Sequence, residues 1–447
     1  MRSTVAPSER ALAGFGLLAA AVLAPAAPAA TPDLAVAAGT AAAAGTATTT
    51  TTTLATTRSI SYHSWSGAPA FRTGALYGLQ AGPAGLRLGR PVGRLAFTDP
   101  ATGVTRRYDY GRWVSPWVRP GFALTQLVPS WEASTHRGSW IQVDVRGIDR
   151  AGRWSSWDTI ADWAYGDTTI HRTSLGAQTD DLAKVATDTW VGQDGHQFRA
   201  WRLRVSLFRR TGTTVTPYVR TVGAMASKVP STDTSPTSPP GVARGIVLDV
   251  PGYSQMLHRG EYPTYGGGGE AWCSPTSTSM VLAYYRRLPA PREYAWVNPS
   301  YRDRFVDHAA RMTYDHRYEG TGNWPFNTAY AAAHADHAFV TRLRSLAEAE
   351  RFVEAGIPLV VSISFSAGAL QGAPLSSTDG HLVVIVGFTA TGDVVVNDPA
   401  ARYDNRVRRT YRRGQFEAAW LTGSGGLAYV IRDDDHPLPA RAGNTNW

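Results

Sequence analysis

The sequence predicts two folded domains of different class: an all-β, sandwich-like domain over residues 59–229 and an α+β domain over residues 245–447. The chain has 447 residues, which is more than a single domain usually holds. Its first half alternates apolar and polar residues in short segments, whereas its second half mixes helical and strand-like patterns. Between the two lies a Ser/Thr/Pro-rich linker, residues 230–244, which we expect to be semi-extended and solvated.

The first 58 residues precede both domains. Arg2 and Arg10 come before an apolar run from Ala11 to Ala24, and an Ala-Pro-Ala pattern follows at 27–29. This is the layout of a secretory signal peptide, with an uncleaved anchor as the alternative. We therefore expect residues 1–29 to be removed and the protein to be secreted, extracellular or associated with the cell wall, with no membrane span left. Residues 30–58 are rich in Ala and Thr, which predicts a disordered stalk.

The basic charge does not indicate a nucleic-acid partner. The net charge is +9, but Lys184 and Lys228 are the only lysines, and the arginines are scattered along the chain. One exception is a knot of arginines between Arg406 and Arg413. A basic surface would instead favour acidic partners such as cell-wall polymers.

The β domain is predicted from strand patterns and turns. Trp140–Arg146 and Trp201–Leu207 alternate apolar and polar residues, as half-buried strands do. Residues Phe97–Gly103 are typical of a hairpin turn. Short strands of this kind without a long helix favour a β-sandwich, whose role (targeting, inhibition or pro-segment) the sequence leaves open.

Ten of the fifteen tryptophans lie between Trp65 and Trp201. We interpret most of them as filling the sandwich core. The alternative is an exposed aromatic platform for sugars or peptides, and Trp113, Trp117 and Trp131 are its best candidates.

Cys273 is the only cysteine. Because it has no partner for an internal disulfide, it is either an inert buried thiol or a reactive one. Apolar residues recur at helical spacing from Thr276 onward, Ser274 is a suitable N-cap, and Pro275 suits the first helical position. Cys273 therefore lies at a helix N-terminus, where the helix dipole lowers a thiol pKa, and we predict that it is a nucleophile.

A cysteine nucleophile needs a base and a group that orients the base. His381 begins an apolar strand, and a turn near Gly392 leads into a second strand that ends in Asn397-Asp398-Pro399. Strict pairing of this hairpin leaves Asp398 a few residues out of register with His381, so a bulge or a strong twist is needed. Asn397 is the rival orienter; since Asn397 and Asp398 point to opposite faces, only one of them serves.

The other histidines have ordinary settings. His334 and His337 fall in an Ala-rich stretch that we expect to be helical, but they lack a third metal ligand. His258 is close to Gln255 and is a candidate to line the cleft. We predict neither a metal nor a cofactor.

The order of Gln255, Cys273 at a helix start, Gly380-His381 before an apolar strand, and Asn397-Asp398-Pro399 after the next strand resembles papain-like cysteine peptidases. More specifically, it is similar to the secreted members of the bacteriocin-processing (double-glycine leader) peptidase-like family. The resemblance spans 247–431 and leaves the N-terminal domain unrecognised. It implies a papain-like cysteine peptidase fold for residues 245–447.

The resemblance also implies roles. Cys273 would be the nucleophile, His381 the base, Asp398 its orienter, and Gln255 a donor to the oxyanion. Ser274 stands where the family often has Gly. The 18 positions between Gln255 and Cys273 exceed the usual spacing, so the Gly-rich insertion must loop out if Gln255 is to reach the site.

These features predict a secreted cysteine hydrolase that cleaves peptide or peptide-like amide bonds through a Cys-His-Asp triad and a thioester acyl-enzyme. Its substrate would be an extracellular peptide, and double-glycine specificity is not expected because the chain carries no transporter. One alternative is a peptidoglycan peptide hydrolase or transpeptidase that the β domain anchors to the wall. Another is a non-catalytic binding protein on a degenerate papain-like scaffold.

Overall fold

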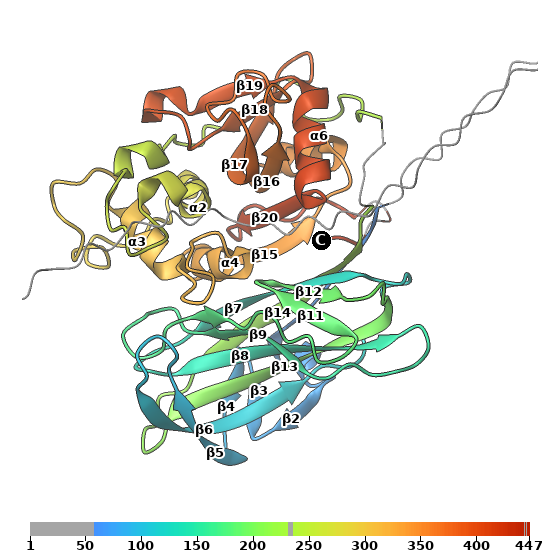
Figure 1. The fold of residues 1–447 in the computed structure, drawn as a ribbon, viewed down its shortest axis with the longest axis vertical. Helices are drawn as coiled ribbons and strands as arrows, with labels where there is room; N and C mark the ends of the chain where they lie inside the picture. The colour runs from blue at the N-terminus through green and yellow to red at the C-terminus, as the bar shows by residue number, and fades with distance from the viewer. Residues whose placement is uncertain (1–57, 231–235, 442, 444) are drawn as a thin grey trace, which may run out of the picture. The chain divides into compact units, whose positions relative to one another are not determined.

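The computed structural model describes residues 58–230, 236–441, 443 and 445–447. The predicted signal peptide (1–29) and all of the predicted stalk except Arg58 lie outside this part. The described residues form one compact unit, in which a β region and a mixed region follow one another along the chain (Figure 1). No helix in the described residues is long and apolar enough to cross a membrane.

The N-terminal region consists of two seven-stranded antiparallel sheets. The first sheet contains β1 (Ser59–Ser66), β3 (Leu79–Gly82), β4 (Gly85–Leu88), β7 (Gln126–Ser134), β11 (Ala183–Ala186), β12 (Thr189–Gly192) and β14 (Tyr218–Lys228). The second contains β2 (Ala75–Tyr77), β5 (Gly93–Thr98), β6 (Thr105–Val114), β8 (Trp140–Asp149), β9 (Asp158–Trp163), β10 (Thr173–Ser174) and β13 (Phe198–Arg210). A single five-residue helix, α1 (Gly67–Phe71), lies among the described elements of this region.

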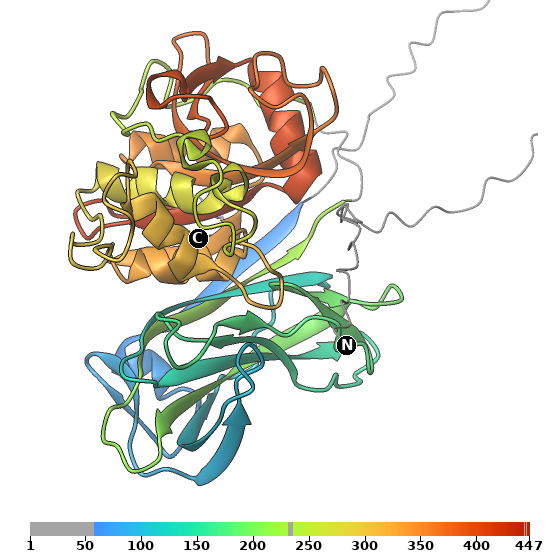
Figure 2. The same ribbon diagram turned by 60° about the vertical axis from the view of Figure 1, so that its left-hand side comes forward.

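The predicted strands and turn of this region are confirmed. Trp140–Arg146 lies in β8 and Trp201–Leu207 in β13, and these two strands pair with each other. The predicted turn joins β5 to β6, where Gly103 N–H donates to Asp99 O at 2.8 Å. β1 runs beside β14 over its whole length, as the turned view shows (Figure 2).

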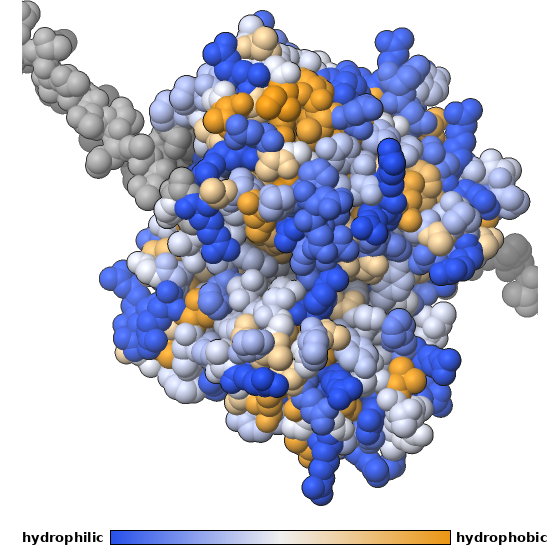
Figure 3. Space-filling model, turned by 180° about the vertical axis from the view of Figure 1, so that it is seen from behind, coloured by the Kyte–Doolittle hydropathy of each residue, from blue (hydrophilic) through white to orange (hydrophobic). Residues whose placement is uncertain are grey.

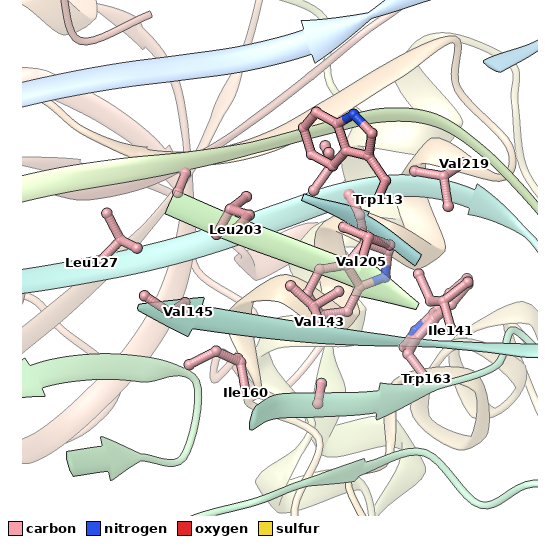
Figure 4. Packing of buried hydrophobic residues seen from close by; sticks show 14 of the residues in the cluster. Trp113, Leu127, Ile141, Val143, Val145, Ile160, Trp163, Leu203, Val205 and Val219 are labelled. Atoms are coloured by element: carbon pink, nitrogen blue, oxygen red, sulfur yellow. The ribbon is translucent and has the colours of Figure 1, made fainter. Parts of the chain in front are cut away.

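Alternation along the strands places apolar side chains between the two sheets. Leu127 and Val219 of the first sheet and Val143, Leu203 and Val205 of the second belong to one buried cluster (Figure 4). Each such side chain contributes roughly 1.5–3 kcal/mol when it is fully buried. This cluster is the core of the sandwich.

Tryptophans fill this core, as expected, and the alternative in which Trp113 and Trp131 form an exposed platform is wrong. Trp113 is 0% exposed and Trp131 is 1% exposed. The indole N–H of Trp113 donates to Phe71 O at 2.8 Å, and its ring packs edge-to-face against Trp65 at 5.2 Å. Trp113 in β6 and Trp131 in β7 point into the core. The residues around them do not alternate regularly, so the sequence did not predict this inward orientation.

Another group of tryptophans lies on the outer face of the second sheet and stacks with arginines. The Arg202 guanidinium lies 4.4 Å from the Trp117 ring centre and 5.2 Å from that of Trp154, which is 51% exposed. We call this group the Arg–Trp ladder; its members are Trp117, Trp154, Trp157, Arg146, Arg202 and Arg204.

The C-terminal region is built on a six-stranded antiparallel sheet with strand order β15-β20-β16-β17-β18-β19. The strands are β15 (His337–Arg342), β16 (Leu359–Phe365), β17 (Thr378–Phe388), β18 (Val394–Asn397), β19 (Arg408–Tyr411) and β20 (Leu427–Arg432). The helices are α2 (Cys273–Tyr284), α3 (Phe305–Thr313), α4 (Trp324–Ala332), α5 (Leu346–Glu354) and α6 (Arg413–Ser424), with 3₁₀ turns η1 (Gln255–His258), η2 (Gly269–Ala271) and η3 (Asp404–Arg406).

The two faces of this sheet are covered by different helices (Figure 1). Residues of α5 and α6 share one buried cluster with Val383 and Ile385 of β17. Residues of α2, α3 and α4 share another cluster with Leu382 and Val384. The region is therefore an α+β arrangement with helices on both faces, which confirms the predicted class.

The part of the linker that the structure describes, residues 236–244, is held by hydrogen bonds. Residues around Ser238 are largely exposed, as expected, but Ser238 N–H and its hydroxyl both donate to the Glu417 carboxylate at 2.7 Å. Gly241 N–H donates to Glu350, whose other oxygen forms an ion pair with Arg413 at 2.7 Å. Hydrogen bonds to these two glutamates fix the second half of the linker on the C-terminal region.

The arginine knot also serves the fold. Arg413 is buried on Glu350, and Arg408 donates to Asn397 Oδ1 at 2.6 Å. Arg413 is therefore not available to an acidic partner, whereas Arg408 remains exposed. The face in Figure 3 is mostly hydrophilic, with apolar residues in small separate groups.

The β region and the mixed region share buried structure. Phe326 and Ala329 of α4 belong to the sandwich core, while Val128 and Met225 of the sandwich belong to the core around α2. Arg172 is fully buried between them: it donates to Ala164 O and Tyr165 O of the β region and to Arg311 O and Tyr314 O at the end of α3.

Replacing Arg172 should destabilise the whole unit. Arg172→Leu leaves four carbonyl groups without their donor, so we expect the free energy of unfolding in urea to fall by about 3 kcal/mol. Arg94→Leu is the control because Arg94 pairs with Asp109 at the surface, where its side chain is 72% exposed; we expect a change of about 1 kcal/mol or less. Equal losses in the two variants would contradict a shared core held by Arg172.

Candidate active site

Cys273 is the first residue of α2. Trp272 occupies the N-cap position, and Thr276 N–H donates to Trp272 O at 3.1 Å. The expectation that Ser274 is the N-cap is wrong, because the helix starts two residues earlier than the capping pattern indicated. The Ser274 hydroxyl instead lies 3.0 Å from the Tyr429 hydroxyl in the interior. Cys273 thus lies in the first turn, where backbone N–H groups have no helical acceptor.

His381 is the fourth residue of β17, opposite Ile363 of β16. The imidazole is 3% exposed, and its Nε2 lies 2.8 Å from Asp398 Oδ1. Since Nε2 is engaged there, Nδ1 is the nitrogen left to face the Cys273 thiol, which is among the groups that raise the pKa of His381. The structure therefore brings Cys273, His381 and Asp398 together.

A β-bulge makes this meeting possible. β17 and β18 pair with Phe388 opposite Val394, but the register shifts between Ile385 and Gly387, so that Val384 lies opposite Asn397. Continuing this register by one residue places Asp398 beside Val383, which is two residues from His381 and shares its face. Without the bulge Asp398 would lie beside Val384, and its side chain would point to the face of the sheet opposite to that of His381.

Asp398 is 1% exposed, and hydrogen bonds hold both of its oxygens. Ala400 N–H donates to Oδ1 at 3.1 Å, and the Tyr411 hydroxyl donates to Oδ2 at 2.8 Å. The sequence reasoning missed Tyr411. Tyr411 ends β19, which pairs with β18, and this pairing brings its hydroxyl to Asp398. The sequence does not reveal the strand order, so it could not predict this contact.

The electrostatics of this group favour a charged pair. Burial alone would lower the pKa of His381, but the Asp398 charge and hydrogen bond, together with Cys273, raise it to about 10. Burial would raise the pKa of the Cys273 thiol, yet His381 and the N–H groups of Leu382 and Ser274 lower it below the ordinary value. The thiolate and the imidazolium therefore coexist at pH values above the lowered pKa of the thiol and below about 10. Above about pH 10 the imidazolium loses its proton and the charged pair is lost.

Asn397, the rival orienter, faces the other way. Its amide nitrogen donates to Val250 O and Pro251 O at 3.1 Å, and its oxygen accepts from Arg408. The carboxylate of Asp398, and not this amide, is the group beside His381.

Gln255 lies next to the segment that leads into Cys273. Its amide nitrogen donates to Glu270 O at 2.6 Å, and its backbone N–H donates to Pro399 O at 3.0 Å. The residues between Gln255 and Glu270 thus loop out, as the long spacing required. An amide nitrogen carries two N–H groups, so one remains beyond the bond to Glu270.

The histidines expected to form a helical pair do not. α4 ends at Ala332, and His337 is the first residue of β15. His334 lies 2.8 Å from the Tyr165 hydroxyl, whereas His337 forms ion pairs with Glu132 and Asp434. The Ala-rich composition predicted a longer helix, but the residues from His337 onward form β15 at the edge of the sheet.

Comparison with protein families identifies this chain. Residues 61–227 match the family model described as Peptidase C39 N-terminal domain, and residues 247–426 match the one described as Peptidase_C39 like family. The two matches together cover most of the chain, which therefore belongs to the peptidase C39-like family. The first match also covers the β region, which the sequence reasoning had left unrecognised.

Two further comparisons concern curated proteins and solved structures. No curated protein matches the sequence. A solved structure titled "Structure of infectious bursal disease virus Gx strain" is 11% identical over 40% of this chain and 61% of its own chain. Its TM-score is 0.09, so it carries no argument about the fold.

Titration of Cys273 should reveal the charged pair. We expect iodoacetamide to alkylate Cys273 with a rate that rises through a pKa below the ordinary thiol value of about 8.5. Asp398→Asn removes the charge that raises the His381 pKa, so the apparent thiol pKa should rise by about one unit or more.

Asp434→Asn is the matched control, since Asp434 pairs with His337 at 3.0 Å and is 78% exposed. Its titration curve should overlay that of the native protein. An ordinary thiol pKa in the native protein would contradict the charged pair and would favour a scaffold without catalysis.

Proposed function

We propose that this protein is a secreted cysteine peptidase that cleaves peptide or peptide-like amide bonds outside the cell. The observation that carries the proposal is the buried hydrogen bond of 2.8 Å between His381 and Asp398, beside a cysteine whose thiol pKa is lowered. Membership of the C39 family supports peptidase chemistry and, with it, a papain-like arrangement of the C-terminal region.

The proposed reaction is acyl transfer to water. The Cys273 thiolate attacks the carbonyl carbon of the scissile amide, and negative charge develops on the carbonyl oxygen. The backbone N–H of Cys273 and the remaining N–H of Gln255 stabilise that oxyanion. The His381 imidazolium gives its proton to the leaving amine, and a thioester to Cys273 remains.

The second half of the reaction uses the same groups in reverse. Neutral His381 takes a proton from water, and the resulting hydroxide attacks the thioester carbonyl. The C–S bond breaks, the acid product leaves, and the thiolate–imidazolium pair is restored. Asp398 stays ionised, because the charge and hydrogen bond of His381, with further hydrogen bonds from Tyr411 and Ala400, hold the pKa of its carboxyl below the usual value despite burial.

Cys273→Ala should abolish hydrolysis. We expect kcat/KM on a mixture of unstructured peptides to fall by about a thousandfold or more, since the nucleophile is lost. The Asp434→Asn variant should keep native activity. Product masses identify the bond cleaved in the native digest. Unchanged hydrolysis of every native substrate by Cys273→Ala would overturn the proposal.

A second candidate function is hydrolysis of wall peptides, with the β region as the anchor. The Arg–Trp ladder favours it, because Trp154 is half exposed and neither Arg146 nor Arg202 forms a salt bridge among the described residues. Aromatic faces beside unpaired guanidinium groups suit a carbohydrate polymer that carries carboxylates.

Sedimentation with insoluble peptidoglycan tests this anchor. Trp154→Ala should lower the bound fraction several-fold at low salt, whereas Val104→Ala, an exposed apolar control at 43% exposure, should not. Identical binding by the native protein and Trp154→Ala would rule out the ladder as the anchor and leave the peptidase proposal intact.

A further inference from the structure

A second cluster of ionisable groups lies where the insertion between Gln255 and Cys273 meets α3. His258 ends η1, Glu261 follows three residues later, and Asp307 lies in the first turn of α3. The imidazole Nδ1 lies 2.9 Å from Glu261 Oε2 and 3.2 Å from Asp307 Oδ2. One donor atom from each of the three residues lies within 4.8 Å of the other two.

The cluster is buried, and one of its carboxylates lacks hydrogen bonds. His258 and Asp307 are both 0% exposed, and neither oxygen of Asp307 has a hydrogen-bond partner among the described residues. No arginine or lysine in the described part forms a salt bridge with Asp307 or Glu261; each pairs with His258 alone. Two carboxylates thus share one imidazole, which leaves negative charge uncompensated even when the imidazole is protonated.

We propose that His258, Glu261 and Asp307 bind a divalent zinc ion. One imidazole nitrogen and two carboxylate oxygens are ligands that zinc accepts, at distances of about 2.0–2.2 Å. Tetrahedral ligands at such distances are roughly 3.3 Å apart, close to the two separations from Nδ1 given above. Calcium and magnesium prefer six or more oxygen ligands, which this cluster does not offer.

The ion neutralises the two carboxylates and gives Asp307 a partner. Three protein ligands leave a fourth position for water. No local pattern in the sequence predicts this site, because Asp307 lies 46 positions after Glu261 and the intervening residues show no ligand spacing.

The ion would fix the insertion against α3. His258 lies on the same 3₁₀ turn as Gln255, and its ring lies 6.1 Å from that of Trp272, the residue before Cys273. Gly269 packs against the His258 backbone, where an added Cβ would come within 2.3 Å of the carbonyl carbon. Zinc therefore acts as a structural clamp that holds Gln255 near the nucleophile.

Zinc titration of the full secreted chain tests the proposal. The chain carries Cys273→Ala, so that the thiolate does not compete as a ligand, and is stripped with EDTA and dialysed beforehand. We expect isothermal titration with ZnCl2 to show one site per chain, and saturating zinc to raise the unfolding temperature, since an ion that binds only the folded state stabilises it.

Glu261→Gln and Asp307→Asn should each weaken this binding at least tenfold and remove the rise in unfolding temperature. The matched control is Asp433→Asn. Asp433 pairs with His436 three residues later at 2.6 Å, but this pair belongs to no three-ligand cluster in the described residues, so zinc binding should not change.

Absence of zinc binding in the Cys273→Ala chain would overturn the proposal, as would native affinity in both Glu261→Gln and Asp307→Asn. If Asp307→Asn fails to fold, Glu261→Gln decides alone, because Glu261 lies at the edge of the cluster with 12% of its side chain exposed. A chain that unfolds earlier in these variants without any response to zinc would show that the three residues form an ion triad only. The peptidase proposal is tested separately and does not depend on this result.

Discussion

The hydrogen bond between His381 and Asp398 is the interaction on which the chemistry of this protein depends. Both groups are almost fully buried, so neither would stay charged there alone. Together, each stabilises the charged form of the other, and the imidazolium in turn lowers the pKa of the Cys273 thiol. A nucleophile at neutral pH therefore depends on the position of one carboxylate.

That position depends on a single extra residue. The bulge at Val386 decides which face of the sheet Asp398 occupies, because side chains alternate along a strand. β19 then supplies the Tyr411 hydroxyl, and the turn after β18 supplies the Ala400 N–H. Without the extra residue in β17, the side chains of β18 would point to the opposite faces relative to His381. The bulge is therefore a functional element of the fold.

The sequence predicted the parts of this site that local patterns determine. The helix that begins near Cys273, the strand that carries His381 and the hairpin to Asp398 follow from periodicity and turn residues. The need for a bulge also followed, since strict pairing failed to bring Asp398 to His381. The bulge itself, the contact from Tyr411 and the burial of Trp113 depend on strand order and register across distant segments, which no local pattern records. Ser274 shows the opposite failure: a good capping residue that tertiary packing draws into the interior against Tyr429.

The β region makes buried contacts with the C-terminal region and is therefore part of its structural support. Ser174 N–H donates to Asp315 at 3.0 Å, and the same carboxylate accepts from Tyr318 N–H and Asn323. This ties the loop between α3 and α4 to the sandwich. The pKa of Tyr318 in this loop is raised mainly by burial, and the charges of Asp188 and Cys273 nearby raise it further. A region that holds part of the surroundings of the nucleophile cannot leave without disturbing them. Of the roles that the sequence left open, the structure thus favours a permanent support over a pro-segment that is removed, because loss of the sandwich would also expose Phe326 and Ala329 of α4 to water.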